Sequence, residues 1–197
     1  MIRLGIDLDG VLCDFSQEVT KMANRLFGKH LAPNFLPQNW SWSDVMTADQ
    51  WTAIWNELMA VEDFWVHLSE LPGARDLHAF LAKNNDAQVY FITSRADSAG
   101  MSTLVQTTQW LEQRNLWPRV DRSIVIVTNA ADKWKHIKAL EIPWFLDDYL
   151  PTIVQIQSIC ESTCGVVFDA PYNQDDRKIP RVYSVAEYLQ YTKQGQS

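Results

Sequence analysis

Acidic residues end two apolar segments that lie far apart in the chain, and their types and spacing suit chemistry on phosphate groups. Asp7 and Asp9 lie at the end of the first apolar segment, and Asp147 and Asp148 lie at the end of a later one. Carboxylates that meet raise one another's pKa unless a positive charge lies among them. Carboxylate and carbonyl oxygens suit Mg²⁺, which binds phosphate oxygens in its remaining positions. If the two acidic pairs meet, we expect a Mg²⁺ site there.

Hydroxyl and cationic side chains stand at the ends of neighbouring elements. Thr93, Ser94 and Arg95 follow the second apolar segment, and Lys133 opens a helical segment before the later acidic pair. Ligands of doubly wound sheets bind outside the carboxyl ends of the strands, so these are the positions to examine. Further lysines follow nearby, and a solvated helix face also explains such a group. We prefer Lys133 because it stands at the helix start.

Five short apolar runs predict the strands that would position these residues. They cover residues 2–8, 88–92, 123–127, 144–147 and 165–168. Segments with helical periodicity separate them, which is typical of a parallel sheet with helices on both faces. One of these segments places a single stripe on Met101, Leu104, Val105, Thr108 and Leu111. The expected fold class is therefore α/β, with a doubly wound parallel sheet.

The gap between the first two predicted strands is longer than one crossover helix needs, so a subdomain is inserted there. Ser16 is placed to cap a helix that Gly28 ends, and Thr47 with Gln50 forms a capping box before a second helix. The insert is therefore helical. The predicted division is a core of residues 1–15 and 72–192, a helical cap of residues 16–71 and a disordered tail of residues 193–197.

The bulk properties bound the kind of protein. A chain of 197 residues suits one domain with a modest insertion, and a net charge of −7 argues against a nucleic-acid polymer as partner. Three cysteines form no metal-ligand pattern and no disulfide framework. The first apolar run is too short for a signal peptide and no run reaches membrane-spanning length, so we expect neither a leader nor a membrane span. We expect a cytoplasmic protein with no membrane partner. These properties are compatible with a homodimer.

The stretch from Asp7 to Phe15, DLDGVLCDF, carries a resemblance to a known family. It is similar to the first motif of the haloacid dehalogenase superfamily, whose four motifs all occur here in order. Within that superfamily the stretch resembles the 5′(3′)-deoxyribonucleotidase branch, as do Pro171-Tyr172-Asn173 and Pro180-Arg181-Val182 near the end of the chain. The resemblance implies a five-stranded sheet of order 3-2-1-4-5 with a small helical cap inserted after strand 1.

The resemblance also implies roles at the reaction centre. Asp7 would be the nucleophile that forms an aspartyl-phosphate, and Asp9 would act as general acid and then as general base. Mg²⁺ would be bound by the Asp7 carboxylate, the Asp9 carbonyl and Asp148. Asp147 would act through water or by orienting Lys133.

Further residues would hold the phosphoryl group. Thr93, with Ser94 as a less favoured substitute, would hydrogen-bond this group, and Lys133 would contact a phosphate oxygen and the nucleophile. Arg95 stands where the branch often has proline, and it could add a phosphate contact or pair with a cap carboxylate such as Asp14. Tyr149 stands where the branch often has arginine, so the substrate is less constrained than the chemistry.

The insert would cover the substrate and select the leaving group. Phe15, Trp40 and Trp42 could stack on a nucleobase, because every base offers a π-face to an aromatic ring. The leading prediction is a Mg²⁺-dependent 5′(3′)-deoxyribonucleotidase acting on (deoxy)nucleoside monophosphates. The alternative is a phosphatase of another small metabolite, such as a sugar phosphate. A phospho-accepting signalling domain or a non-catalytic binding protein fits the motifs less well.

Overall fold

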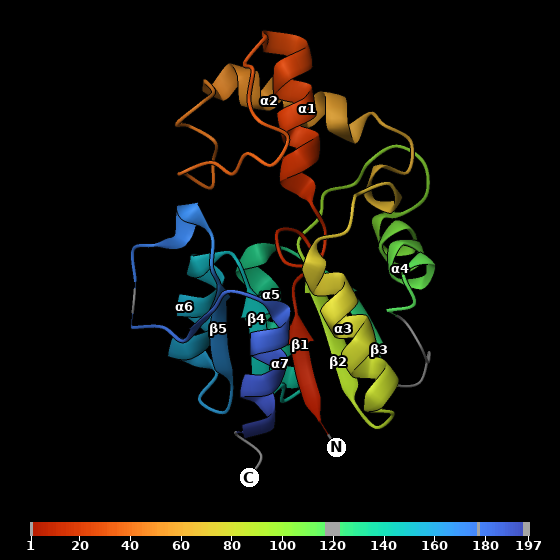
Figure 1. Cartoon of the computed structure of the whole chain (residues 1–197), viewed down its shortest axis with the longest axis vertical. Coiled ribbons are helices and arrows are strands. Elements are labelled where there is room, and N and C mark those ends of the chain that lie inside the picture. Colours follow the sequence, from red (N-terminus) through yellow and green to blue (C-terminus); the bar gives the residue numbers. More distant parts are fainter. Residues whose placement is uncertain (1, 117–122, 177, 195–197) are drawn as a thin grey trace.

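A parallel sheet lies at the centre of the computed structural model, which describes residues 2–116, 123–176 and 178–194 (Figure 1). Its strands run in the order β3-β2-β1-β4-β5-β6. Their bounds are β1 Arg3–Ile6, β2 Gln88–Thr93, β3 Ser123–Val127, β4 Trp144–Asp147, β5 Cys164–Phe168 and β6 Arg181–Val182. The predicted α/β class and the order of the first five strands are confirmed.

The described residues form six strands where the sequence predicted five. The additional strand, β6, has two residues and pairs in parallel with β5 at the sheet edge. A run of two residues is too short to produce a periodic apolar pattern, which is why it escaped the prediction. It matters for the site because it follows the turn that carries Tyr172.

Helices cover both faces of the sheet. Their bounds are α1 Phe15–Phe27, α2 Ala48–Met59, α3 Pro72–Lys83, α4 Thr103–Gln113, α5 Lys133–Ala139, α6 Leu150–Ile159 and α7 Val185–Gln194, with short 3₁₀ turns η1 Phe64–Val66, η2 Ala130–Asp132 and η3 Pro171–Asn173. None of the helices in the described residues combines the length and the apolar character that crossing a membrane requires.

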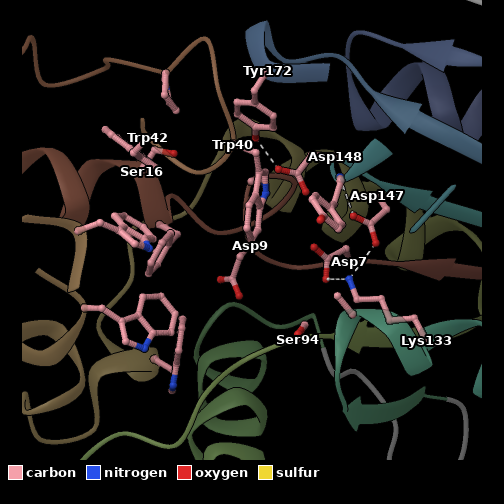
Figure 2. Close-up of a pocket in the computed structure, with 18 residues that line it drawn as sticks. Asp7, Asp9, Ser16, Trp40, Trp42, Ser94, Lys133, Asp147, Asp148 and Tyr172 are labelled. Atoms are coloured by element: carbon pink, nitrogen blue, oxygen red, sulfur yellow. Dashed lines mark hydrogen bonds and ion pairs between the residues drawn. The ribbon is translucent and has the colours of Figure 1, made fainter. Parts of the chain in front are cut away.

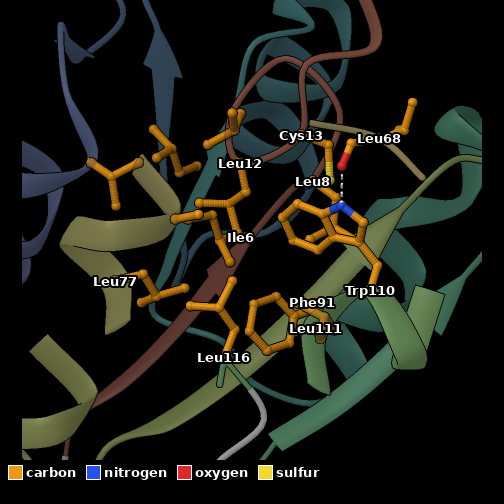
Figure 3. Close-up of a cluster of buried hydrophobic side chains, with 14 of the residues drawn as sticks. Ile6, Leu8, Leu12, Cys13, Leu68, Leu77, Phe91, Trp110, Leu111 and Leu116 are labelled. Carbon is orange, nitrogen blue, oxygen red and sulfur yellow. Dashed lines mark hydrogen bonds between the residues drawn. The ribbon is translucent and has the colours of Figure 1, made fainter. Parts of the chain in front are cut away.

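Two buried clusters show which helices cover which face. Val89 and Phe91 of β2 pack with residues of α3, α4 and α7, whereas Tyr90 and Ile92 of the same strand pack with residues of α5 and α6. Successive strand residues point to opposite faces, so a strand buried on both sides is apolar throughout. Figure 3 shows the first cluster, in which the Trp110 indole donates to the Leu68 carbonyl oxygen at 2.8 Å. The central strands are thus packed on both faces by helices.

The helix termini follow the predicted chemistry with one correction. Thr47 and Gln50 form the predicted capping box, and Gly28 ends α1 in the left-handed conformation. Ser16 was predicted to cap α1, but Asp14 does so, with its carboxylate accepting from the Gln17 amide at 2.9 Å. Helix α1 therefore begins at Phe15, two residues earlier than a cap at Ser16 would imply.

The apolar stripe predicted for α4 is also wrong. Leu104 and Val105 are exposed, at 49% and 42%, while Thr107 and Gln106 are fully buried. Gln106 turns inward because its amide has partners there: its oxygen accepts from the Trp65 amide at 3.0 Å and its nitrogen donates to the Met101 carbonyl at 2.6 Å. Satisfied hydrogen bonds thus place a polar side chain where periodicity alone predicts an apolar one.

Two chain segments connect the core to α1 and α2, which lie beyond the carboxyl ends of the central strands (Figure 1). The segments run side by side: the Asp14 amide donates to the Ser69 carbonyl at 2.9 Å, and the Leu71 amide donates to the Leu12 carbonyl at 2.8 Å. We propose that this link divides a cap of residues 16–71 from a core of residues 1–15 and 72–192. Lys193 and Gln194, predicted to lie in a disordered tail, belong to α7, and residues 195–197 lie outside the described residues.

Candidate active site

The loop after β1 carries the first acidic residues into the space between core and cap. The Asp7 amide donates to the Leu146 carbonyl of β4 at 2.9 Å, which aligns the two strand ends. The Leu8 carbonyl then accepts from the amides of Leu12 and Cys13 at 2.7 and 2.8 Å. Gly10 has a φ of +82°, and a Cβ there would collide with the Asp148 carboxylate. A glycine is therefore required where this loop passes the acidic pair.

Three buried carboxylates meet at this edge of the sheet (Figure 2). Asp7, Asp147 and Asp148 each offer an oxygen within 4.8 Å of the others. The Lys133 ammonium, only 2% exposed, lies 2.9 Å from Asp7 Oδ1 and 2.8 Å from Asp147 Oδ2. Asp147 Oδ1 accepts from the Tyr149 amide at 2.8 Å. Both oxygens of Asp147 are thus engaged, which favours its role in orienting Lys133.

The electrostatics of the cluster leave room for a further positive charge. Burial raises the pKa of Asp7 to about 7, and the neighbouring carboxylates of Asp147 and Asp9 add to the rise, while Lys133 opposes it. Burial likewise raises the pKa of Asp148 well above its usual value, with Asp147 and Asp7 contributing. Burial alone would lower the pKa of Lys133, yet Asp147 and Asp7 raise it. One ammonium therefore faces three carboxylates, and this oxygen donor set fits a divalent metal ion.

Asp9 lies apart from this cluster, against Arg95. The Arg95 guanidinium donates from Nε to Asp9 Oδ2 and from Nη2 to Asp9 Oδ1, both at 2.8 Å. A cap carboxylate such as Asp14 was one predicted partner of Arg95, but Asp14 caps α1. Asp9, the predicted general acid and base, is therefore held by Arg95, which was predicted as a phosphate contact.

The residues after β2 divide between the interior and the pocket. Thr93 is fully buried, and its hydroxyl lies 3.4 Å from Asp9 Oδ2. Ser94 is exposed and lines the pocket, with Asp7, Asp9 and Lys133. Neither Thr93 nor Arg95 is among the lining residues. Of the two hydroxyl residues predicted to hold the phosphoryl group, only Ser94, the less favoured one, lines the pocket.

Tyr172 is a site residue that the sequence analysis did not assign. Its hydroxyl donates to Asp148 Oδ2, and it lines the pocket (Figure 2). The Asn173 amide nitrogen donates to the Asp148 carbonyl at 2.8 Å, and Arg181 Nη2 donates to the Asn173 carbonyl at 2.6 Å. The Pro171-Tyr172-Asn173 motif was the available signal. It anchors the second residue of the acidic pair.

Aromatic side chains form the cap side of the pocket. Phe15 packs near-parallel to Trp65, with ring centroids 5.9 Å apart and an interplanar angle of 23°. Trp42 is only 3% exposed and stacks on Trp51, with centroids 6.3 Å apart. The lining residues outside the acidic cluster that the sequence did not assign include Ser16, Pro37, Trp51, Trp55, Trp65, Ala130 and Tyr149. A large aromatic surface thus faces the carboxylates.

Trp40 joins the cap to the core across the mouth of this pocket. Its side chain is 51% exposed, and its ring lies 4.6 Å from the ring of Tyr149, centroid to centroid. Trp40 is therefore free to meet a ligand on one side, whereas Trp42 is committed to packing within the cap. The structure brings all three predicted aromatic residues, Phe15, Trp40 and Trp42, to the pocket.

Comparison with solved structures identifies the fold. The chain is similar to L-2-haloacid dehalogenase from Xanthobacter autotrophicus, with 12% identity, full coverage of both chains and a TM-score of 0.59. It is also similar to the haloacid dehalogenase-like hydrolase SP0104 from Streptococcus pneumoniae, with 12% identity, 97% and 98% coverage and a TM-score of 0.57. A third similar structure is the magnesium-bound HAD-hydrolase YfnB from Bacillus subtilis, with 16% identity, 98% and 99% coverage and a TM-score of 0.55.

Sequence comparison narrows this to a family. No curated protein matches the chain. The family model described as 5′ nucleotidase, deoxy (pyrimidine), cytosolic type C protein matches residues 1–194. That match spans the acidic pairs, Lys133 and the cap segment together. The chain therefore belongs to this 5′ nucleotidase family, within the haloacid dehalogenase-like hydrolases, and is a phosphatase of the nucleotidase type.

Proposed function

We propose that this phosphatase is a Mg²⁺-dependent 5′(3′)-deoxyribonucleotidase that acts on (deoxy)nucleoside monophosphates through an aspartyl-phosphate on Asp7. The observation that carries the proposal is the position of the Asp7 carboxylate, which lines one pocket together with Lys133, three further carboxylates and an aromatic wall. We also propose a cytoplasmic location, which the free thiols of all three cysteines support.

The first chemical step transfers the phosphoryl group to the protein. An Asp7 carboxylate oxygen attacks phosphorus, the bond from phosphorus to the ester oxygen breaks, and the Asp9 carboxyl group gives its proton to that oxygen. Lys133 keeps Asp7 in place and neutralises charge on the phosphoryl oxygens, which is the main requirement of phosphoryl transfer. Ser94 is placed to hydrogen-bond the transferring group.

The second step returns Asp7 to its starting state. The Asp9 carboxylate takes a proton from water, the water oxygen attacks phosphorus, and the bond from phosphorus to Asp7 breaks to release phosphate. A Mg²⁺ ion held by Asp7, Asp148 and the Asp9 carbonyl would neutralise further charge in both steps. Tyr172 fixes the Asp148 carboxylate through its hydroxyl donor.

The test is a panel of phosphate esters assayed with and without Mg²⁺. We expect phosphate release to be fastest from nucleoside 5′- and 3′-monophosphates, with ribo and deoxy forms compared directly. Sugar phosphates and glycerol phosphate, which carry no aromatic base to stack on the aromatic wall, should turn over more slowly. Faster release from sugar phosphates than from every nucleotide would contradict the proposed substrate class but not the phosphatase chemistry.

Replacing Trp40 should separate nucleotides from base-free substrates. In Trp40→Ala we expect KM for a nucleoside monophosphate to rise about 5- to 150-fold, because stacking on a base is worth about 1–3 kcal/mol. KM for glycerol phosphate should stay unchanged. The exposed Tyr183, which does not line the pocket, provides the matched aromatic control as Tyr183→Ala. Equal KM changes for both substrates in Trp40→Ala would argue against base stacking at this residue.

Mg²⁺ affinity should fall as the pH falls below about 7. The pKa of Asp7 is raised to about 7, so the metal-free carboxyl group is protonated below that pH and must lose its proton to bind the ion. We expect the dissociation constant of Mg²⁺ to rise about tenfold per pH unit for each proton displaced. Calorimetric titration in buffers of different ionisation enthalpy would count these protons. An affinity that is constant between pH 5.5 and pH 8 would contradict this prediction.

The same raised pKa makes a pH-dependent contribution to the stability of the metal-free protein. The folded-state pKa of Asp7 lies above its unfolded value of 3.8. The contribution of Asp7 to the free energy of unfolding is therefore fully present below pH 3.8. It is lost as the pH rises toward about 7. Thermal melting without metal should therefore show declining stability over this range, and added Mg²⁺ should restore stability most at the higher pH values.

A further inference from the structure

We propose that Arg95 is a positioning residue, which fixes the Asp9 carboxyl group in the place and plane needed for proton transfer to the leaving oxygen. The inference rests on the proposed function, in which Asp9 serves as general acid and base. Arg95 itself does not line the pocket, whereas Asp9 does. Arg95 therefore acts through Asp9 and does not contact the substrate.

The contact between the two side chains has two points. Arg95 Nε donates to Asp9 Oδ2 and Arg95 Nη2 donates to Asp9 Oδ1, each at 2.8 Å. Two parallel hydrogen bonds from a planar guanidinium define both the position and the orientation of a carboxylate, which one ammonium group cannot do. The other protein contact to this carboxylate, from the Thr93 hydroxyl, is longer at 3.4 Å. Arg95 is thus the main constraint on how Asp9 faces the pocket.

The guanidinium is itself fixed from three sides. Its Nη1 donates to the Thr107 hydroxyl of α4 at 3.1 Å, and its Nη2 also donates to the Cys13 sulfur at 3.1 Å. The ring of Trp65 lies over it, 4.8 Å from the guanidinium carbon to the ring centroid. The Arg95 side chain is 0% exposed and that of Asp9 is 19% exposed. A rigid, buried group therefore holds a partner that is open to the substrate.

Trp65 links this arrangement to the substrate pocket. Trp65 lines the pocket and packs near-parallel to Phe15, the first residue of α1. Its indole nitrogen donates to the Ala96 carbonyl at 2.9 Å, next to Arg95 in sequence. The side chain that covers Arg95 is therefore also part of the aromatic wall. Asp9 is held in a fixed relation to the surface on which the leaving group would lie.

The readout is a comparison of two leaving groups within one enzyme preparation. Benzyl phosphate needs a proton on its departing oxygen, because the leaving group is an alcohol. The leaving group of 4-nitrophenyl phosphate departs as the stable 4-nitrophenolate anion and needs no proton. For Arg95→Met and Arg95→Lys we expect kcat/KM for benzyl phosphate to fall about 100-fold. A small displacement of a catalytic group lowers the rate by about this factor. For 4-nitrophenyl phosphate the fall should be under about fivefold, because general acid catalysis adds little there. The ratio does not depend on how much of the variant is folded.

The double variant and a control decide between roles. If Arg95 acts through Asp9, Arg95→Met should change the leaving-group ratio by less than about twofold in an Asp9→Asn background, because contacting residues are not additive. Arg114→Met is the matched control, because Arg114 also lies over a tryptophan. Its guanidinium carbon is 4.1 Å from the Trp110 ring centroid, and its Nη2 donates a hydrogen bond to the Leu68 carbonyl. It should lower stability without changing the ratio.

Two outcomes separate failure of the inference from failure of the proposed function. Equal losses on both esters in the Arg95 variants, with Asp9→Asn still selectively impaired on benzyl phosphate, would overturn the positioning role alone. An Asp9→Asn variant that keeps full activity on benzyl phosphate would overturn the proposed role of Asp9 itself. A ratio that shifts in both Arg95 variants and not in Arg114→Met would support the inference.

Discussion

An Asp7→Asn variant is expected to lose turnover by a factor on the order of 10⁴ or more while keeping or gaining stability. Loss of a nucleophile commonly costs this much, since the remaining groups supply only binding and charge stabilisation. Stability should not fall, because the Asp7 carboxylate is destabilised by burial and by neighbouring carboxylates. A neutral amide removes that repulsion, and Lys133 keeps Asp147 as its partner. Phosphate release and thermal melting of the same sample would measure both effects.

Asp14→Asn is the matched control for this change. Asp14 is a carboxylate of the same loop that caps α1 and does not line the pocket. Asparagine caps a helix about as well as aspartate, so the variant should fold and turn over like the original protein. Appreciable turnover in Asp7→Asn, together with normal folding, would contradict an aspartyl-phosphate on Asp7.

A Lys133→Met variant is expected to lose both activity and stability. Removing one charged donor from a developing anion costs on the order of 10²–10³-fold in kcat. Removing one partner of a buried ion pair costs about 3–5 kcal/mol, because the Asp7 and Asp147 carboxylates are left without a cation. Urea unfolding without metal would measure the loss. It should be larger at pH 8 than at pH 5.5, where a proton on a buried carboxylate replaces the missing charge.

Lys135→Met provides the comparison for Lys133. Lys135 belongs to the same helix, but its side chain is 57% exposed and pairs with Asp132 at 2.6 Å. Exposed pairs contribute about 0–1 kcal/mol, so this variant should differ little from the original protein. If Lys135→Met and Lys133→Met behaved alike, the assignment of the phosphate-contacting cation to Lys133 would fail.

The strand ends could be predicted because the chemistry of the sheet is local in sequence. Asp7 and the Asp147-Asp148 pair each follow a continuous apolar run, and parallel strands bring such ends to one edge. Lys133 could be placed by the same reasoning, at the start of the helix before β4. The structure brings all four side chains together. This part of the site required only the order of the strands.

The partner of Arg95 could not be predicted in the same way. Whether its side chain turns outward to a phosphate or inward to a carboxylate depends on how α4 and the turn η1 pack, through Thr107 and Trp65. Those contacts join residues from separate elements, and no periodic pattern encodes them. The inward face of α4 was missed for the same reason, since the buried Gln106 side chain accepts a hydrogen bond from the backbone amide of Trp65, which is distant in sequence.

The paired connection between cap and core limits how the pocket can open. A single flexible link would let the helices α1 and α2 swivel in any direction, whereas two hydrogen-bonded segments must bend together. We expect them to restrict the helices mainly to tilting about the connection itself, where Cys13 pairs with Glu70. The Trp40–Tyr149 contact joins the two parts at a separate point, so we expect such tilting to separate these two rings and to move Phe15, next to the connection, less. A ligand would therefore enter on the Trp40 side and leave by the same route.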